Sequence, residues 1–354
     1  MNKKRTVQLV FCLDCKRTFT AGKEQRKRNI VRRHLEDGSS YRTIQRRDGY
    51  SKTTAVKCMR ELGKTVKDSA WIARSLKPKW RSVLCVDGTY VGVRNAFAHL
   101  ARKERWFEDE SERFLHKLIA IIGTDYHTRD LPHYAIGDNE NMIDLVMFFQ
   151  QLKENGYDLE VLVRDGNKAI GEAAVHVYGK PIDQQLCHHH FLAKFDDAMA
   201  VKTCDAKDQK NILDLKMRVC SIIRVPDIDL ACTRAAQFFR EQNRFKTSVV
   251  TTELVGKFIR DYESLTEYLQ HPRGFVPTTV NVSENMNKQL KDRLTPMCRF
   301  QSIQSAENYV KLWCLKRRFQ KFTDCKKPFK HLNGKAPLEI AGSSIGGLDY
   351  LNLT

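Results

Sequence analysis

Two aspartates stand where the sequence predicts that buried strands end. Asp87 follows the apolar run VLCV, residues 83–86, and Asp165 ends the run LEVLVR, residues 159–164. Catalytic groups tend to gather at the carboxyl ends of parallel strands, so both carboxylates could work at one edge of a sheet. Each aspartate also precedes a glycine, and Asp-Gly pairs are very common in turns. Taken singly, each aspartate is more readily explained as a turn residue than as a catalytic one.

A third carboxylate, Glu284, stands in the first turn of an amphipathic helix predicted from NVSENMNKQLKDR, residues 281–293. Asn281 and Glu284 have the spacing of a capping box, in which the glutamate reaches back to a free backbone N–H. Together, however, three carboxylates at one sheet edge would suit Mg²⁺ or Mn²⁺, because these hard cations prefer oxygen ligands. Two such ions can activate an attacking oxygen and stabilise a leaving one, which is phosphodiester chemistry on nucleic acid.

Cys12 and Cys15 form a Cys-x-x-Cys knuckle that resembles one half of a zinc ribbon. A structural zinc site needs four ligands, usually from two such knuckles, and no second knuckle is visible. The sequence therefore leaves zinc at this pair as one interpretation, and two ordinary thiols explain it at least as well.

The composition favours a globular protein with a polyanionic partner. The 354 residues include 61 Lys+Arg against 42 Asp+Glu, a formal net charge of +19, and 42% of them are hydrophobic. Such an excess of positive charge most often means nucleic acid, although a solvated basic surface is the alternative. The 11 cysteines form no disulfide framework, which indicates a reduced intracellular setting. The apolar runs are too short to span a membrane.

The elements that must position these residues fall into three kinds. Residues 24–62 predict three short helices with a tight glycine turn before the last, which is a helix-turn-helix pattern rich in Arg and Lys. In that arrangement the third helix would enter a DNA groove with Lys52, Thr53, Thr54 and Lys57; the alternative is a plain three-helix packing unit. Short strands then precede alternating helices and strands, which predicts a mixed sheet, with a second strand beginning after a turn at Asp87-Gly88. Residues from about 191 to 272 read as an all-helical insertion.

The motifs VDGTYVGV, VRDGNKAI and NVSENMNKQLKDR resemble the DDE motifs of insertion-sequence transposases, above all the mutator-type and related bacterial and archaeal families. Between the last two motifs, QQLCHHHFLAKF carries the Cys187-x-x-His190 spacing of the mutator-like group. The likeness continues after Glu284 in Asn287, Leu290, Lys291 and Arg293. It runs in order from about residue 82 to 320.

This resemblance implies an RNase H-like catalytic core, with helices on both faces of its sheet, interrupted by the helical insertion. It implies Asp87, Asp165 and Glu284 as catalytic ligands of Mg²⁺ or Mn²⁺. Cys187 and His190 would organise the site or contact DNA; zinc there is conceivable, but the core supplies no obvious second pair of ligands. Asn287, Lys288, Lys291 and Arg293 would lie beside DNA. Asp125, Asp138 and Glu140 match no motif and are expected to be peripheral.

The expected divisions of the chain follow from these patterns. They are a partial zinc-ribbon-like segment (1–22), a helix-turn-helix domain (23–66), a linker (67–81), the first part of the core (82–190), the helical insertion (191–276), the last part of the core (277–320) and a basic C-terminal tail (321–354).

The sequence thus predicts a DNA transposase that binds element ends and performs metal-dependent cleavage and strand transfer. Its partners would be double-stranded DNA, both terminal inverted repeats and target DNA, and further copies of the chain assembled on that DNA. It would lie in a prokaryotic cytoplasm, associated with the nucleoid and not with a membrane. Two alternatives stay open: a decayed transposase that only binds DNA, and a structure-specific nuclease on the same fold.

Overall fold

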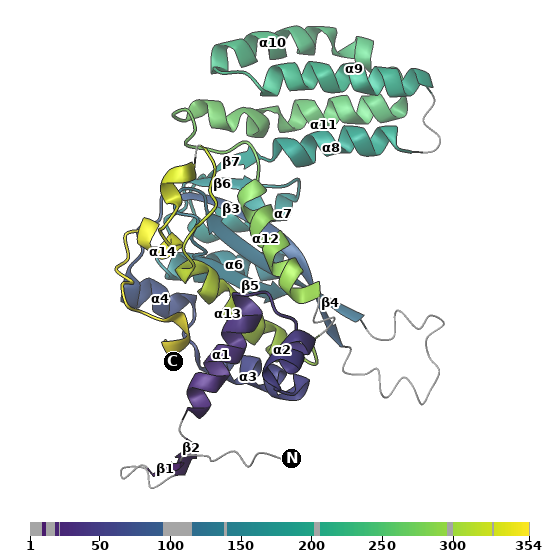
Figure 1. Ribbon diagram of the computed structural model, residues 1–354. Helices are drawn as coiled ribbons and strands as arrows, with labels where there is room; N and C mark the ends of the chain where they lie inside the picture. The colour runs from purple at the N-terminus through teal and green to yellow at the C-terminus, as the bar shows by residue number, and fades with distance from the viewer. Residues whose placement is uncertain are drawn as a thin grey trace.

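The chain combines a central sheet with helices, as the order of its strand and helix patterns predicts (Figure 1). The computed structural model describes residues 9–11, 18–20, 22–94, 115–137, 140–201, 206–295, 300–327 and 329–353. Within these ranges, no helix has both the length and the apolar character needed to cross a membrane. The sheet and helices of the described residues confirm the predicted mixed α/β class.

In the described part of the chain, five strands form one mixed sheet in the order β5-β4-β3-β6-β7. The strands are β3 (Val83–Arg94), β4 (Leu115–Asp125), β5 (His133–Gly137), β6 (Val161–Arg164) and β7 (Asp183–Leu186). β4 runs antiparallel to β3 and β5 antiparallel to β4, whereas β6 runs parallel to β3 and β7 parallel to β6. The carboxyl ends of β3, β5, β6 and β7 therefore point the same way.

The turn predicted at Asp87-Gly88 is wrong. β3 continues through both residues, and Asp87 pairs with Ile122 while Gly88 pairs with Ile121 in the long ladder with β4. The glycine serves a close approach instead of a turn, because a Cβ at Gly88 would collide with the carboxylate of Glu140. The sequence alone does not distinguish a glycine in a turn from a glycine that leaves room for a neighbouring side chain.

Helices cover both faces of the sheet. On one face lie α6 (Met142–Glu154) and α7 (Lys168–Tyr178), whose side chains share a core with Leu84 and Val86 of β3. On the other face lie α12 (Asn281–Leu294) and α13 (Ile303–Phe319), which share a core with Val91 and Val93. Because side chains alternate along a strand, Asp87 falls on the face of β3 that α12 covers.

The N-terminal part begins with the antiparallel pair β1 (Leu9–Phe11) and β2 (Thr18–Thr20). Cys12 and Cys15 lie outside the described residues. Four helices follow: α1 (Lys23–Leu35), α2 (Tyr41–Asp48), α3 (Lys52–Thr65) and α4 (Ser69–Leu76). α4 occupies the segment predicted as a linker.

The α2–α3 connection is short and well capped. Gly49 ends α2 with a φ of 69°, in the left-handed region that glycine adopts most easily. The side chains of Ser40 and Ser51 accept hydrogen bonds from the backbone N–H groups of Thr43 and Thr54 at the starts of the two helices. Buried residues of α1, α2 and α3 belong to the same core as α13, so these helices pack against the body of the protein.

Beyond β7, the helices α8 (His188–Met199), α9 (Ala206–Ile223), α10 (Ile228–Glu241) and α11 (Val249–Thr266) stack together, as the upper part of Figure 1 shows. Short 3₁₀ turns, η2 (Gln242–Phe245) and η3 (Glu267–Gln270), follow α10 and α11. Phe195, Phe238 and Phe258 are fully buried in a core of their own among these helices. The helical character predicted for residues 191–272 is thus found in this stack.

The C-terminal segment packs on the N-terminal helices. It contains η5 (Phe329–Leu332), α14 (Pro337–Ile340) and η6 (Tyr350–Asn352). Tyr350 donates a 2.8 Å hydrogen bond to Glu36, Asp349 pairs with Arg32, and the backbone N–H of Lys67 donates to the carbonyl of Leu353 at 2.8 Å. The C-terminal segment is therefore held against the end of α1 and the segment that follows α3.

Candidate active site

The registers of β3, β6 and β7 bring Asp87, Asp165 and Cys187 into one row across the sheet. β6 pairs with β3 so that Cys85 faces Val163, and extending that register by two residues sets Asp165 level with Asp87. β7 pairs with β6 so that Arg164 faces Leu186, which sets Cys187 level with Asp165. The backbone N–H of Cys187 donates to the carbonyl of Arg164 at 2.8 Å, so the row is held at its far end.

Helix α12 is tied to β3 at two points one helical turn apart. The hydroxyl of Ser283 donates a 2.9 Å hydrogen bond to the carbonyl of Cys85, and Nδ2 of Asn287 donates a 2.7 Å bond to Oδ2 of Asp87. Both side chains are buried. Glu284 lies between these two tied residues in α12, so its backbone is held close to Asp87.

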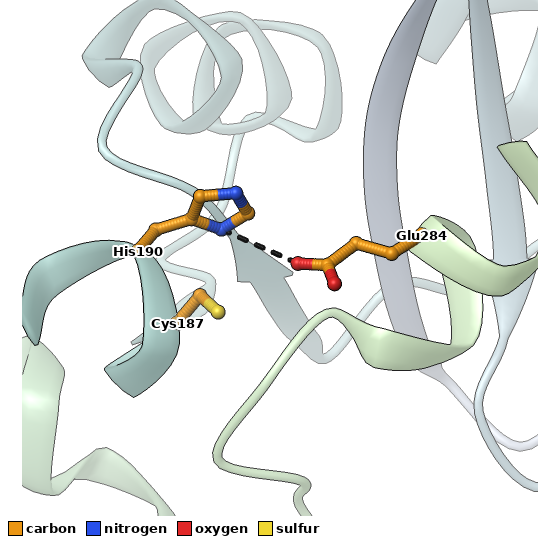
Figure 2. Close-up of side chains that lie close together, drawn as sticks. All are labelled: Cys187, His190 and Glu284. Carbon is orange, nitrogen blue, oxygen red and sulfur yellow. Dashed lines mark ion pairs between the residues drawn. The ribbon is translucent and has the colours of Figure 1, made fainter. Parts of the chain in front are cut away.

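Glu284 does not make the capping-box contact that its spacing from Asn281 allows. α12 begins at Asn281, and its N-cap is Val280, whose aliphatic side chain cannot accept a capping hydrogen bond. Ser283, at the third helical position, bonds to β3. The carboxylate of Glu284 instead lies 3.6 Å, from Oε1 to Nδ1, from the imidazole of His190 (Figure 2). Glu284 therefore faces α8 across the end of the sheet.

Cys187 and His190 come together at the start of α8, and Figure 2 shows both side chains facing Glu284, which extends from α12. A hydrogen bond with Cys187 and the negative charges of Glu284 and Asp165 raise the pKa of His190 to about 9, against the lowering effect of burial. His190 is therefore a cation at neutral pH, and it forms an ion pair with Glu284.

The acids influence one another electrostatically. Burial raises the pKa of Asp87, and the negative charges of Asp165 and Glu284 act in the same direction. The hydrogen bond from Asn287 and the charge of His190 oppose this effect. A carboxylate surrounded by other carboxylates holds a proton more tightly, unless a cation is present to neutralise the group.

Glu140 belongs to this site, although it was expected to be peripheral. Its Oε2 accepts a 3.2 Å hydrogen bond from Nδ2 of Asn167, and the backbone N–H of Asn167 donates to Oδ1 of Asp165 at 2.8 Å. Burial raises the pKa of Glu140, and the charges of Asp165 and Asp87 add to the effect. The signal in the sequence was its place just after β5, a strand that runs parallel to β3.

The other two acids expected to be peripheral have different outcomes. Asp138 lies outside the described residues. Asp125 is fully buried and accepts hydrogen bonds from Thr128, from the backbone of Arg81 and from the hydroxyl of Tyr157. Asp125 therefore supports the fold and is turned away from the row of Asp87 and Asp165.

Two sets of side chains in the described part of the chain could hold a metal ion. One is Cys187, His190 and Glu284, and the other is Asp183, Glu267 and His271; in each set the ligand atoms lie within 4.8 Å of one another. Asp87, Asp165 and Glu284 do not form such a set among the described residues. The sulfur and nitrogen ligands of the first set suit zinc, whereas the carboxylates around Asp87 suit Mg²⁺ or Mn²⁺.

The residues predicted to contact DNA are divided between two helices. Lys52, Thr53, Thr54 and Lys57 are all exposed on the first turns of α3. On α12, Lys288 and Lys291 are exposed, whereas Asn287 is only 3% exposed and bonds to Asp87. The guanidinium of Arg293 lies against Gly38, at the α1–α2 turn.

A known protein family covers most of this chain. Residues 41–320 match the family described as "Transposase, Mutator family". No curated protein matches the sequence. The matched region holds β3, β6, α8 and α12, and with them the acids and the Cys187-x-x-His190 pair. Since it covers well over half of the 354 residues, this chain belongs to the Mutator family of transposases.

Proposed function

We propose that this chain is a DNA transposase of the DDE type, with Asp87, Asp165 and Glu284 as its catalytic acids. It cleaves a phosphodiester at each end of a DNA element and joins the freed 3′-hydroxyl to target DNA. Its sheet, with α6, α7, α12 and α13, is the RNase H-like core. A dimer or larger assembly on DNA would bring two ends together.

The observation that carries this proposal is the common register of β3 and β6. It sets Asp165, which follows the end of β6, level with Asp87 within β3, and α12 brings Glu284 to the same end of β6. Ligands and catalytic groups collect at the carboxyl ends of parallel strands because several strand ends converge there. Turn aspartates and a helix cap would not need to meet, and here one of the two aspartates is not in a turn.

The acids supply the carboxylate oxygens that a hard divalent cation prefers, and binding would draw Asp87, Asp165 and Glu284 closer together than they lie here. Asp87 accepts a hydrogen bond from Asn287, and Asp165 and Glu140 each accept one from Asn167. Oε1 of Glu284 is buried with no hydrogen-bond partner. Mg²⁺ or Mn²⁺ would be held by Asp87, Asp165 and Glu284. When bound, such ions supply charge that favours an attacking oxygen and a leaving oxygen in line.

The chain's own residues position the reactants. Asn287 fixes the orientation of Asp87, and the backbone N–H of Asn167 fixes that of Asp165. His190 holds Glu284 at the mouth of the site by charge attraction, and its cationic form is favoured there. Exposed Lys288 and Lys291 on α12 lie where they would meet phosphates of the DNA strand.

A helix-turn-helix formed by α2 and α3 would recognise the element ends. The first turns of α3 expose Lys52, Thr53, Thr54 and Lys57, and the N-terminal residues of a recognition helix are those that reach base edges. Packing of α3 on α13 supports a fixed orientation between the DNA-binding helix and the core.

The test is a cleavage and joining assay with purified full-length chain, DNA carrying the element ends, and Mg²⁺. The wild-type chain should nick the ends and join them to target DNA. Asp165→Asn should bind the same DNA equally well but cut nothing, while the matched control Asp158→Asn, an exposed residue paired with Lys180, should cut normally. Full cleavage by Asp165→Asn would show that the assignment is wrong.

Two further outcomes separate the alternatives. Binding without cleavage by the wild-type chain, at any Mg²⁺ or Mn²⁺ concentration, would make it a DNA-binding protein only. Cleavage without joining would make it a nuclease.

A further inference from the structure

A cavity of about 760 Å³ opens beside the start of α12, between the helical stack, the segment that follows η3, and the C-terminal segment. Its volume falls within the range of about 300–1,000 Å³ typical of small-molecule sites. Its lining has three arginines, Arg129, Arg273 and Arg317, and no aspartate or glutamate. A cavity with this charge would accept an anion.

Two of these arginines are buried without a carboxylate partner. Arg129 is 8% exposed and Arg317 is 6% exposed, and neither forms an ion pair with any described carboxylate. The neighbouring Arg318 shows the contrast, since it is 1% exposed and makes two hydrogen bonds to Asp130. Arg129 does have a side-chain hydrogen bond with Tyr126 and is attracted by the charge of Asp125. Buried charges are normally paired with an opposite charge, so two guanidinium groups without a salt bridge mark a place for an anion.

Aromatic rings hold both groups in place. Cζ of Arg129 lies 4.6 Å from the ring centroid of Tyr126 and 4.4 Å from that of Phe329. Cζ of Arg317 lies 4.8 Å from the ring centroid of Phe322, and its Nε donates only to the weak acceptor Sδ of Met286. A guanidinium group placed over an aromatic ring still has in-plane N–H donors for an anion, apart from the donor that Arg129 uses for Tyr126.

Burial lowers the pKa of both arginines, that of Arg317 to about 10. An arginine side chain keeps its charge in proteins, so the cavity holds positive charge. The cavity thus offers fixed positive charge together with aromatic surface, which is the combination that binds a phosphate and a base in one nucleotide.

The cavity adjoins the acids. Asn281 and Asn285 line it, and the same two residues line a shallower hollow that contains Glu284 and Lys288. The hollow beside Glu284 and the cavity therefore share the Asn281 and Asn285 side of α12.

We propose that this cavity binds one unpaired nucleotide of the DNA strand next to the cleaved phosphodiester, with its phosphate on Arg129 and Arg317 and its base against the aromatic side chains. The inference rests on the proposed function and adds to it. It means that the transposase distinguishes an end with a frayed or single-stranded flank from a fully paired one.

The experiment measures binding and cleavage separately. Binding is measured in EDTA, so that nothing is cut, with a duplex of the element end carrying three unpaired nucleotides beside the cleavage position and with the same duplex fully paired. Wild type should bind the tailed duplex about tenfold more tightly, as expected for charge-assisted bonds to one phosphate. Arg129→Gln and Arg317→Gln should abolish this preference, while Arg240→Gln on the exposed side of α10 should keep it.

Two further arms identify the source of the nucleotide and guard against misfolding. Thymidine 5′-monophosphate and inorganic phosphate, each added at millimolar concentration, should leave the preference intact; its loss would assign the cavity to a free nucleotide or phosphate. If thermal melting shows that Arg317→Gln is unfolded, Phe329→Ala replaces it, because Phe329 is 38% exposed and stacks on Arg129.

Equal wild-type affinity for tailed and paired DNA would overturn the inference. An equal loss of affinity for both duplexes in the arginine variants would also overturn it. Neither result touches the proposed function, which is decided by cleavage in Mg²⁺. Asp165→Asn should keep the preference for tailed DNA while cutting nothing, so failure of one idea does not imply failure of the other.

Discussion

Nδ2 of Asn287 on α12 donates a 2.7 Å hydrogen bond to Oδ2 of Asp87 in the middle of β3. The two residues are 200 positions apart in the chain, and the helical stack lies between them in sequence. The bond orients the first acid of the site from the helix that carries the last one. Asn287 thus aligns Asp87, although the family likeness places it among residues beside DNA.

Replacing Asn287 with alanine should therefore reduce DNA cleavage while leaving the chain folded. Loss of one hydrogen bond to a charged group costs about 1.5–3 kcal/mol, so cleavage should fall roughly 10- to 100-fold. The measurement is single-turnover cleavage in Mg²⁺, with DNA affinity measured in parallel. Gln289→Ala on the same helix is the control and should cut normally; a normal rate in Asn287→Ala would show that Asp87 does not depend on this bond.

A methyl group at Gly88 should disturb the site by displacing Glu140. A Cβ there would collide with the carboxylate of Glu140 and come within 2.9 Å of Cγ2 of Ile119. Gly88→Ala should therefore displace Glu140, weaken its contact with Asn167 and slow cleavage. Gly256→Ala is the matched control, since nothing lies within 4 Å of a Cβ at that position in α11.

The two glycine substitutions should also change stability in opposite directions. Gly256→Ala should raise the free energy of unfolding by roughly 0.5–1 kcal/mol, because alanine is the better helix former. Gly88→Ala should lower it, as measured by urea denaturation. Equal stability and equal activity in both variants would mean that Gly88 is not needed for a close approach.

The elements of this protein were largely predictable from sequence because their signals are local. Ser40 and Ser51 mark the starts of helices, Gly49 marks the end of one, and the apolar run at residues 83–86 marks a buried strand. The acids Asp87 and Asp165 could be selected because they follow such runs. The mixed sheet follows from the order of these signals along the chain.

What could not be predicted depends on contacts between distant segments. Pairing with β4 decides whether β3 continues through Gly88. The path of the chain after β5 decides that Glu140 lies against Gly88. The ion pair of Glu284 with His190 and the bond of Asn287 to Asp87 join residues about 90 and 200 positions apart. Local sequence signals carry no information on such pairings.

The exposed lysines of α3 should contribute to DNA affinity mainly by neutralising phosphates. Replacing both Lys52 and Lys57 with alanine should weaken binding and lower the dependence of log affinity on log salt by roughly one for each phosphate that is no longer neutralised. The measurement is a titration of DNA binding between about 50 and 200 mM salt, where affinity falls more steeply the more phosphates the protein neutralises. Lys153→Ala on α6, which binds the carbonyl of Val177, is the control. An unchanged salt dependence would place the DNA on another surface.

Acid should destabilise this fold through three buried histidines. Burial lowers the pKa of His34, His133 and His188 to about 4 in each case. In the unfolded chain a histidine has a pKa near 6.5 and takes up a proton earlier, so the unfolded state binds more protons between these two values. Stability is therefore complete above about pH 6.5 and is lost progressively as the pH falls towards 4.

The test for this pH dependence uses His34. It lies between the carbonyl of Ser39 and the hydroxyl of Tyr309, and each contact is 2.9 Å. His34→Gln should lower stability at pH 7 but reduce its further loss between pH 6.5 and 4, measured by urea denaturation. His176→Gln on the exposed side of α7 should leave the pH profile unchanged. A profile for His34→Gln that is parallel to that of wild type would contradict the assignment.

Of the ion pairs Arg318–Asp130 and Lys180–Asp158, the first should cost more stability when one partner is replaced. Nε and one terminal nitrogen of Arg318 donate to the two carboxylate oxygens of Asp130 at 2.8 and 2.7 Å, and the side chains are 1% and 0% exposed. Trp80 also donates to this carboxylate at 2.8 Å, so Asp130 joins α13 to the segment before β3. Asp130→Asn would leave a buried guanidinium unpaired, which costs about 3–5 kcal/mol.

The exposed pair Lys180–Asp158 gives the comparison, because its atoms also lie 2.8 Å apart while its side chains are 43% and 71% exposed. Asp158→Asn should change the free energy of unfolding by only about 0–1 kcal/mol, since water and salt screen the charges. A double variant, Asp130→Asn with Arg318→Met, should recover part of the stability because it removes the unpaired charge. If Asp130→Asn is no more destabilising than Asp158→Asn, burial does not set the value of these ion pairs, and the core between β4 and α13 must be more hydrated than its side-chain exposure indicates.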